Sequence, residues 1–324
     1  MVGSLHFILL LFAPLLVVSQ SHQGLELAQW TNNYTVPCNL DNGLSHAMAT
    51  VMDGKIWIIC ENVVPPNIIT PFYTRWFVFD PITELFTEIG NQPRLLLTPH
   101  FLAIFADGND LYALRGPLFQ SFPINRILYK LNKVTSNWDS IMSIPSTFPL
   151  RSVVALDGML YILEWREDRF VTLTVVDLED ERNIGWMSLH NPSSSWTGFL
   201  STYENRVMLV EAYDNNRTVS EFKNETLVKI HSEQPAYADP LYEKPVQSTD
   251  SLEYVHININ SNFETRVFDF DSHTWQTNVT HPDWSVPKTA IALYSVMKIN
   301  ESIYTLVKQN TGGVLKLHKL DLGV

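Results

Sequence analysis

The fold is decided by a pattern first seen in residues 53–59, Asp-Gly-Lys-Ile-Trp-Ile-Ile, and residues 75–80, Arg-Trp-Phe-Val-Phe-Asp. A turn precedes a short apolar run, and a second strand-like run follows after a loop. The pattern returns at residues 109–114 with 126–131 and at 157–163 with 171–177, and weaker copies begin at Asn205, Leu252 and Asn300. Copies recur roughly every 50 residues, and such a period with four short strands per repeat is typical of a β-propeller blade.

A further strand is expected before each turn, most clearly at residues 47–52, 100–105 and 151–156. Asp53-Gly54, Asp107-Gly108 and Asp157-Gly158 are predicted to form the hairpin turns, because Gly tolerates positive φ. The second strands are apolar at consecutive positions, which indicates burial on both faces. Helical periodicity does not extend beyond a few residues, so the sequence predicts an all-β chain.

The order of turn, apolar strand and later aromatic resembles the kelch repeat. Residues 79–86 and 270–275 match its third strand, turn and fourth-strand aromatic, and residues 132–138 match more loosely. Trp186 and Leu227 occupy the same place in the third and fourth repeats. The Gly-Gly pair that usually follows the second strand of a kelch repeat is missing from every copy. The resemblance implies a divergent, six-bladed kelch-like β-propeller.

The last repeat lacks its fourth strand, because the chain ends three residues after Asp321. Residues 25–30, Leu-Glu-Leu-Ala-Gln-Trp, precede the first repeat and are predicted to supply that strand, with Trp30 in the aromatic position. Pairing both chain ends in the last blade would remove two exposed sheet edges and close the ring.

Residues 1–21 carry no Asp, Glu, Lys or Arg and contain a short apolar core followed by Ser19 and Ser21. This pattern predicts a signal peptide, with a membrane-spanning helix as the alternative, and leaves residues 22–324 as a single propeller domain. Five Asn-X-Ser/Thr sequons support a secreted, extracellular glycoprotein: Asn33, Asn216, Asn224, Asn278 and Asn300.

The chain has a formal net charge of −12, which disfavours nucleic acid and membrane headgroups as partners. No segment after residue 21 is long and apolar enough to predict membrane insertion. Cys38 and Cys60 are its two cysteines. In an oxidising compartment they are most simply a disulfide, and two free thiols are the alternative.

Catalytic motifs are scarce. The sequence has no His-X-His, His-Glu-X-X-His or Gly-X-Ser-X-Gly, so no metal, cofactor or catalytic residue is predicted. The acidic run Glu179-Asp180-Glu181 falls where a solvent-exposed turn is expected.

Long loops after the second strands carry aromatic and Arg side chains, which are common in binding surfaces. They form a candidate binding face of Phe72, Tyr73, Arg115, Phe119, Phe122, Trp165 and Arg166. The alternative is that these aromatics only pack the loops onto the blades. On this basis we expect a non-catalytic binding module for an extracellular protein or glycan. The alternative function is an extracellular carbohydrate-active or oxidase-type propeller enzyme.

Overall fold

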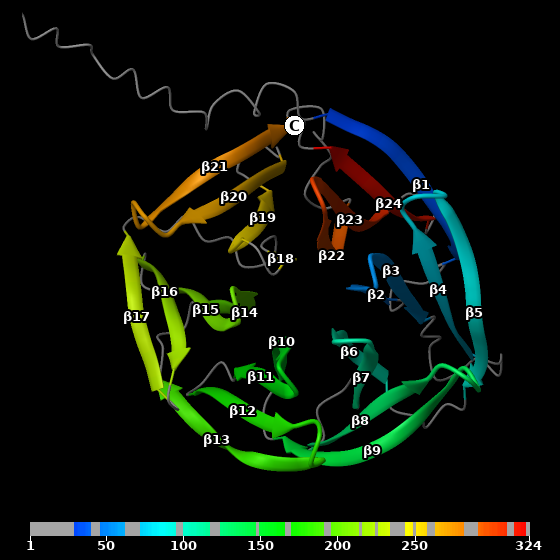
Figure 1. The fold of residues 1–324 in the computed structure, drawn as a ribbon, viewed down its shortest axis with the longest axis horizontal. Coiled ribbons are helices and arrows are strands. Elements are labelled where there is room, and N and C mark those ends of the chain that lie inside the picture. The colour runs from blue at the N-terminus through cyan, green and yellow to red at the C-terminus, as the bar shows by residue number, and fades with distance from the viewer. Residues whose placement is uncertain are drawn as a thin grey trace, which may run out of the picture.

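The computed structural model describes residues 29–39, 46–61, 72–94, 100–116, 124–146, 149–165, 170–190, 196–213, 216–223, 226–233, 244–248, 251–257, 263–281, 291–309 and 314–321. These residues form β-strands and the turns between them. The strands gather into sheets set around a common axis (Figure 1). The all-β class expected from the sequence is therefore confirmed.

Four sheets contain four antiparallel strands each, in chain order. The first sheet contains β2 (His46–Met52), β3 (Lys55–Glu61), β4 (Phe72–Asp80) and β5 (Leu85–Arg94). The second contains β6 (His100–Asp107), β7 (Asp110–Gly116), β8 (Ile124–Asn132) and β9 (Asn137–Ser146). The third contains β10 (Leu150–Leu156), β11 (Met159–Trp165), β12 (Val171–Asp177) and β13 (Arg182–His190). The fourth contains β14 (Thr197–Tyr203), β15 (Arg206–Tyr213), β16 (Asn216–Lys223) and β17 (Thr226–Glu233).

The fifth sheet has eight strands in the order β1-β24-β23-β22-β18-β19-β20-β21. One half contains β18 (Lys244–Gln247), β19 (Glu253–Ile257), β20 (Phe263–Asp269) and β21 (Thr274–His281). The other contains β22 (Ile291–Ile299), β23 (Ser302–Gln309), β24 (Val314–Asp321) and β1 (Gln29–Asn39). The two halves meet where β18 pairs in parallel with β22, with Val246 opposite Val296.

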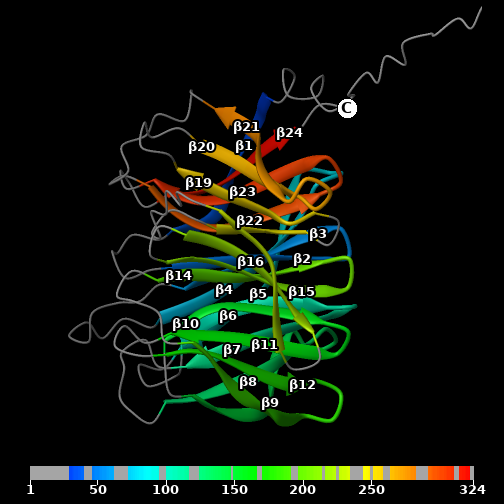
Figure 2. The ribbon, with the colours of Figure 1, turned by 90° about the vertical axis from the view of Figure 1, so that its left-hand side faces the viewer.

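The strands nearest the axis in Figure 1 are β2, β6, β10, β14, β18 and β22. Each contacts the next in this order, and β22 contacts β2. These inner strands therefore surround the axis without a break. The short hairpin turns that join the described strands lie at one end of the molecule (Figure 2), which we call the hairpin end.

The turns between first and second strands are made by the expected pair of residues in two of three places. Asp53 and Gly54 have φ values of 54° and 66°, and Asp157 and Gly158 have 50° and 74°. Asp107-Gly108 was the wrong pair, because Asp107 lies opposite Asp110 and the turn is made by Gly108 and Asn109. Gly108, at φ 53°, supplies the left-handed conformation as the first turn residue.

The turns between third and fourth strands of the first three sheets and of the β18–β21 half share one design. The carboxylate of Asp80 accepts hydrogen bonds from the backbone N–H groups of Ile82 and Thr83. Four residues after Asp80, Glu84 adopts a φ of 56°. The same arrangement recurs at Asn132 to Ser136, Asp177 to Glu181 and Asp269 to His273. The side-chain oxygen stands in for a backbone acceptor and fixes each turn. The acidic run at residues 179–181 lies in such a turn and is exposed, as expected.

The N-terminal strand completes the last group of strands, as expected. β1 pairs antiparallel with β24, and Trp30 lies opposite Leu320. Trp138 lies opposite Leu131 and Trp275 opposite Phe268, so Trp30 has the expected register position. The strand is longer and begins later than expected, and residues 25–28 lie outside the described residues.

The core lies between neighbouring sheets. One apolar cluster joins Phe105, Tyr112 and Leu128 of the second sheet to Leu160 and Ile162 of the third. Comparable clusters join the first and second sheets, the third and fourth, and the fourth and the β18–β21 half. Sheets that pack face to face explain why β3 and β11 are buried at almost every position.

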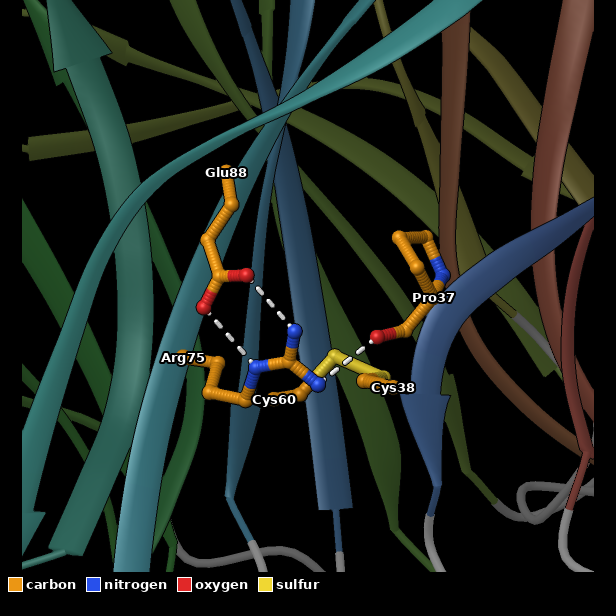
Figure 3. Close-up of a disulfide and its surroundings, with 5 residues drawn as sticks. All are labelled: Pro37, Cys38, Cys60, Arg75 and Glu88. Carbon is orange, nitrogen blue, oxygen red and sulfur yellow. Dashed lines mark hydrogen bonds and ion pairs between the residues drawn. A yellow bond between two sulfur atoms is a disulfide. The ribbon is translucent and has the colours of Figure 1, made fainter.

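The closing junction, where β1 and its half of the fifth sheet meet the first sheet, carries a covalent bond in addition to its apolar cluster. Cys38 of β1 is joined to Cys60 of β3, so the predicted disulfide is confirmed. Beside it the Arg75 guanidinium donates to the carbonyl oxygen of Pro37 at 2.8 Å and to both carboxylate oxygens of Glu88 (Figure 3). The Tyr34 hydroxyl donates to Glu84 at 2.6 Å, and its ring packs on Phe79.

Candidate functional site

The inner strands line a partly open cavity of about 280 Å³ on the central axis. It is lined by the second half of several of these strands, for example Thr50 of β2, Phe105 of β6, Leu200 of β14 and Lys298 of β22. These residues lie close before the hairpin turns in the sequence. The cavity therefore occupies the hairpin-end half of the channel, and every inner strand contributes to its wall.

The cavity wall is polar as well as apolar. Its uncharged polar side chains are Thr50, Ser152, Ser201, Thr202, Gln247 and Ser248. Several of them also join one inner strand to another. The Ser152 hydroxyl donates to the carbonyl oxygen of Leu200 and accepts from the Leu200 N–H. The Thr202 hydroxyl donates to the carbonyl oxygen of Ser248, and the Gln247 amide donates to that of Ala49.

Lys298 supplies the only cationic side chain among the described residues that line the cavity. Its ammonium group lies 3.2 Å from a carboxylate oxygen of Glu253 and 3.4 Å from the Ser251 hydroxyl. The Lys298 side chain is 12% exposed and that of Glu253 is 2% exposed. The pair is therefore largely shielded from water, in surroundings where each charge acts strongly on nearby groups.

Carboxylates follow the lining segments at the hairpin end. Asp53, Asp107 and Asp157 end or follow β2, β6 and β10. Asp107 accepts a hydrogen bond from the Gly158 N–H at 3.1 Å. Burial raises the pKa of the Asp107 carboxyl above its usual range, and the charges of Asp157, Asp110 and Glu179 raise it further. Lysines partly compensate these carboxylates, since Lys133 lies 3.8 Å from Asp53 and Lys130 lies 2.6 Å from Asp110.

The structure describes only some of the candidate binding face. Trp165 ends β11, is 8% exposed and packs against Trp196 and the Arg151 guanidinium. Arg115 lies in β7 over the rings of Phe101 and Tyr129, and burial lowers the pKa of its guanidinium. Both side chains pack against the sheets.

The other members of that face are less fully described. Phe72 and Tyr73 begin β4, but their side chains fall outside the described part of the chain. Phe119, Phe122 and Arg166 lie outside the described residues altogether. The structure therefore does not bring the seven residues together as one surface.

Sequence reasoning missed a set of buried carboxylates near the ends of second strands. Glu61, Glu164 and Glu211 are each at most 5% exposed and lie opposite Thr74, Thr172 and Thr218. Glu164 also forms an ion pair with buried Arg126 of the second sheet. The signal was present in the sequence, since all three acids directly follow apolar runs in equivalent repeats.

The sequons differ in accessibility. Asn33 in β1 and Asn300 in the turn before β23 are exposed. Asn216 is half-buried, and Thr218 of the same sequon is 3% exposed. Asn224 lies outside the described residues, and the Asn278 side chain is not described. Glycosylation therefore stays a prediction.

No group of three or more His, Cys, Asp or Glu side chains in the described part of the chain is placed to hold a metal ion. Within the same residues, no helix has the length and apolar character needed to cross a membrane.

No protein-family model matches the chain, and no curated protein matches it. Solved structures do resemble it. An oligogalacturonate lyase in complex with manganese has a TM-score of 0.50 at 8% identity, with 90% of this chain and 95% of that chain covered. The periplasmic gluconolactonase of Pseudomonas aeruginosa has a TM-score of 0.50 at 12% identity, with 86% and 85% covered. A protein of unknown function from Dyadobacter fermentans has a TM-score of 0.57 at 11% identity, with 91% and 99% covered.

These likenesses establish a β-propeller-like fold, and at such identities they establish only the fold. They nevertheless correct the expected function. The non-catalytic binding module was the wrong choice, because two of the three neighbours are named as enzymes and favour the enzymatic alternative. The kelch type of the repeat receives no support from them.

Proposed function

We propose that this chain is an extracellular enzyme that acts on a carbohydrate bound in the central cavity. We read the eight-stranded sheet as two blades joined through β18 and β22, which makes a six-bladed, kelch-like propeller formed by residues 22–324. The disulfide favours an oxidising compartment, in keeping with a removed signal peptide over residues 1–21. The enzymatic neighbours and the polar cavity support the proposal together.

The observation that carries the proposal is Lys298, which lines the cavity and pairs with the buried Glu253 behind it. An ammonium group held in a water-poor site stabilises negative charge as it develops on a substrate oxygen. Glu253 and Ser251 hold this ammonium in place, so little reorganisation is needed during the reaction. We assign Lys298 as the catalytic cation and Glu253 as a positioning residue.

The oxidase-type alternative has less support. An oxidase that cross-links a tyrosine to a cysteine needs a free thiol, and Cys38 and Cys60 are the chain's two cysteines. They are joined to each other. The carbohydrate-active reading needs no thiol and is the one that we retain.

The test is turnover by the secreted protein on a panel of oligosaccharides and sugar lactones, followed by release of reducing ends or of acid. We expect Lys298→Met to lower kcat by roughly 10²–10³-fold, the usual loss when one stabilising group of this kind is removed. Lys55→Met is the matched control, because Lys55 is a half-exposed lysine that also pairs with a carboxylate, Asp80.

Lys298→Met leaves Glu253 buried beside an apolar side chain and could unfold the protein. Lys298→Arg keeps the positive charge but moves it, so we expect it to fold and to lower kcat while KM changes little. Full activity in a folded Lys298→Met or Lys298→Arg protein would refute the assignment, and absence of turnover across the whole panel would refute the proposed function.

A further inference from the structure

The cavity wall has a distinct construction where the two halves of the eight-stranded sheet meet. β18 and β22 are hydrogen-bonded to each other in parallel, and in the part of the chain that the structure describes no other two inner strands share a sheet. Gln247 lies opposite Met297 at this joint. The residues that follow are Ser248 and Lys298, and both line the cavity. The parallel register therefore brings a serine hydroxyl to the same part of the wall as the Lys298 ammonium group.

A second serine lies between these two side chains. Ser251 belongs, like Ser248, to the connection between β18 and β19. Its hydroxyl oxygen accepts a hydrogen bond from the Lys298 ammonium group at 3.4 Å. The hydroxyl oxygen of Ser248 lies 3.2 Å from the same Ser251 oxygen. Lys298, Ser251 and Ser248 thus form a continuous series of hydrogen-bonding groups that ends at the cavity.

The chemistry of its members gives this series a direction. An ammonium group only donates hydrogen bonds, whereas a serine hydroxyl donates one hydrogen and accepts through two lone pairs. Because Ser251 accepts from Lys298, its own hydrogen is able to bond the Ser248 oxygen. In that arrangement the Ser248 hydroxyl donates to an oxygen of a molecule in the cavity.

The positive charge at one end makes the hydroxyl at the other end a stronger donor. Hydrogen bonds in series polarise one another, and a charge acts strongly on its neighbours where water is scarce. The Lys298 side chain is 12% exposed, and the Glu253 carboxylate holds its ammonium group from the side away from Ser251 or beside it at 3.2 Å. The charge is therefore fixed next to the series.

Ser248 is also fixed before a substrate binds. The Thr202 hydroxyl of β14 donates to the carbonyl oxygen of Ser248 at 3.3 Å. The side-chain amide of the preceding residue, Gln247, donates to the carbonyl oxygen of Ala49 in β2 at 3.3 Å. A donor that is held in place by such contacts needs little reorganisation during a reaction.

We infer that Ser248 donates a proton to the leaving oxygen of the substrate and that Ser251 connects Ser248 to Lys298. This inference rests on the proposed function and adds the acid of the same reaction. Ser248 is then a further catalytic residue, and Ser251 is a positioning residue.

The step is written for a hydrolysis. As the bond between the substrate carbon and the leaving oxygen breaks, its electron pair stays on that oxygen, which takes the hydrogen of Ser248. Ser248 takes the hydrogen of Ser251, and Ser251 takes one from Lys298, which becomes a neutral amine. The water molecule that adds to the substrate carbon releases the proton that restores the ammonium group. The sum consumes water and no other co-reactant.

The experiment follows the substrate that the secreted protein turns over in the panel described above. Ser248→Ala and Ser251→Ala should each lower kcat by about 10²-fold with little change in KM, which is the lower end of what a general acid contributes. Ser272→Ala is the matched control, because its hydroxyl also lies beside another hydroxyl, that of Thr274 at 2.7 Å, but at an exposed turn. It should leave kcat unchanged.

Two measurements separate a proton relay from a structural role of the serines. Residues that act as a unit have non-additive effects, so the double variant of Ser248→Ala with Ser251→Ala should lose no more activity than Ser248→Ala alone. The solvent deuterium isotope effect on the chemical step, measured in a single turnover, should be large in the wild type and should largely disappear in Ser251→Ala. Ser251→Thr keeps the hydroxyl and should restore most of the rate and of the isotope effect.

Circular dichroism verifies that each variant is folded. If Ser248→Ala does not fold, Ser248→Cys replaces it, and its weaker S–H donor should still lower kcat. A folded Ser248→Ala or Ser248→Cys protein with wild-type kcat would contradict the inference.

The remaining outcomes distinguish the inference from the proposed function. Wild-type kcat in Ser251→Ala, together with a large loss in Lys298→Met, would overturn the relay and leave Lys298 acting directly on the substrate. Losses that multiply in the double variant would also overturn the relay alone. Absence of turnover by the wild type across the whole panel would overturn both.

Discussion

The closing junction and the junction between the second and third sheets both hold two neighbouring groups of strands together, but they do so through different contacts. Both have an apolar cluster, but the closing junction adds a disulfide and half-exposed polar contacts around Arg75. The second–third junction adds a buried ion pair, Arg126 with Glu164, and no covalent tie. Continuous chain already holds the second and third sheets close together, whereas β1 is separated from β24 by nearly the whole sequence. The disulfide links β1 to β3 across 22 residues of sequence and so fixes the N-terminal strand on the first sheet, whereas the join of β1 to the distant β24 is made by strand pairing.

Breaking the buried pair should have the largest effect. Glu164→Gln leaves the Arg126 guanidinium buried without its counter-charge and should lower the free energy of unfolding by about 3–5 kcal/mol. Urea denaturation measures it. Glu88→Gln makes the same change in the half-exposed Arg75–Glu88 pair and should cost at most about 1 kcal/mol. Equal losses in the two variants would show that burial does not distinguish the junctions.

Removing the disulfide should have the second-largest effect on stability. Replacing both cysteines, Cys38→Ser with Cys60→Ser, should lower the free energy of unfolding by about 3 kcal/mol, since the bond closes a loop of 22 residues. The same loss should follow from a reductant in the wild type. A reduced protein as stable as the oxidised one would contradict the role given to this bond.

Acid should weaken the closing side of the molecule selectively. Burial lowers the pKa of His318 in β24 to about 4, and Lys316 contributes to the shift. In the unfolded chain the His318 imidazole takes up a proton as the pH falls below about 6.5. In the folded chain it does so only near pH 4. Stability is therefore lost over this window as the pH falls, by about 2 kcal/mol between pH 7 and pH 5. In His318→Gln that loss should shrink, while His273→Asn, at an exposed turn histidine, should keep it.

The smallest effect is expected from one hydroxyl at the closing junction. Tyr34→Phe removes the hydrogen bond to Glu84 and should cost about 1 kcal/mol, because Glu84 is exposed and water can replace the donor. Tyr161→Phe in the third sheet is the matched control and should cost less. A Tyr34→Phe loss as large as that of the disulfide variant would reverse the ranking.

Local sequence was sufficient to predict two of the three hairpin turns and the pairing of the N-terminal strand with the last repeat. Asp53-Gly54 and Asp157-Gly158 encode their turns through residues that tolerate positive φ. Trp30 could be placed in register because the last repeat lacks a fourth strand, and the disulfide followed from the cysteine count. Each of these inferences uses neighbours in sequence or the difference between one repeat and the others.

The site could not be predicted in the same way. Which inner-strand residues line the cavity depends on how the sheets are set around the axis, and Thr202 or Gln247 carries no local mark of that position. In the sequence, Glu164 resembles an exposed acidic residue at the end of a strand. Its burial depends on the ion pair with Arg126, which lies in another sheet. Trp165 suggested a binding face because its packing against Trp196 is a contact between repeats.

Because β1 pairs with β24, the two strands of this pair are synthesised far apart in time. β1 leaves the ribosome first, but its partner β24 follows only at residues 314–321, roughly 15–60 s later at about 5–20 residues per second. Cys60 emerges soon after Cys38, so the sulfur bridge can form long before the ring is complete. We expect the disulfide to hold β1 against the first sheet until β24 has been synthesised. The unpaired backbone edge of β1 would then be less accessible to other nascent chains.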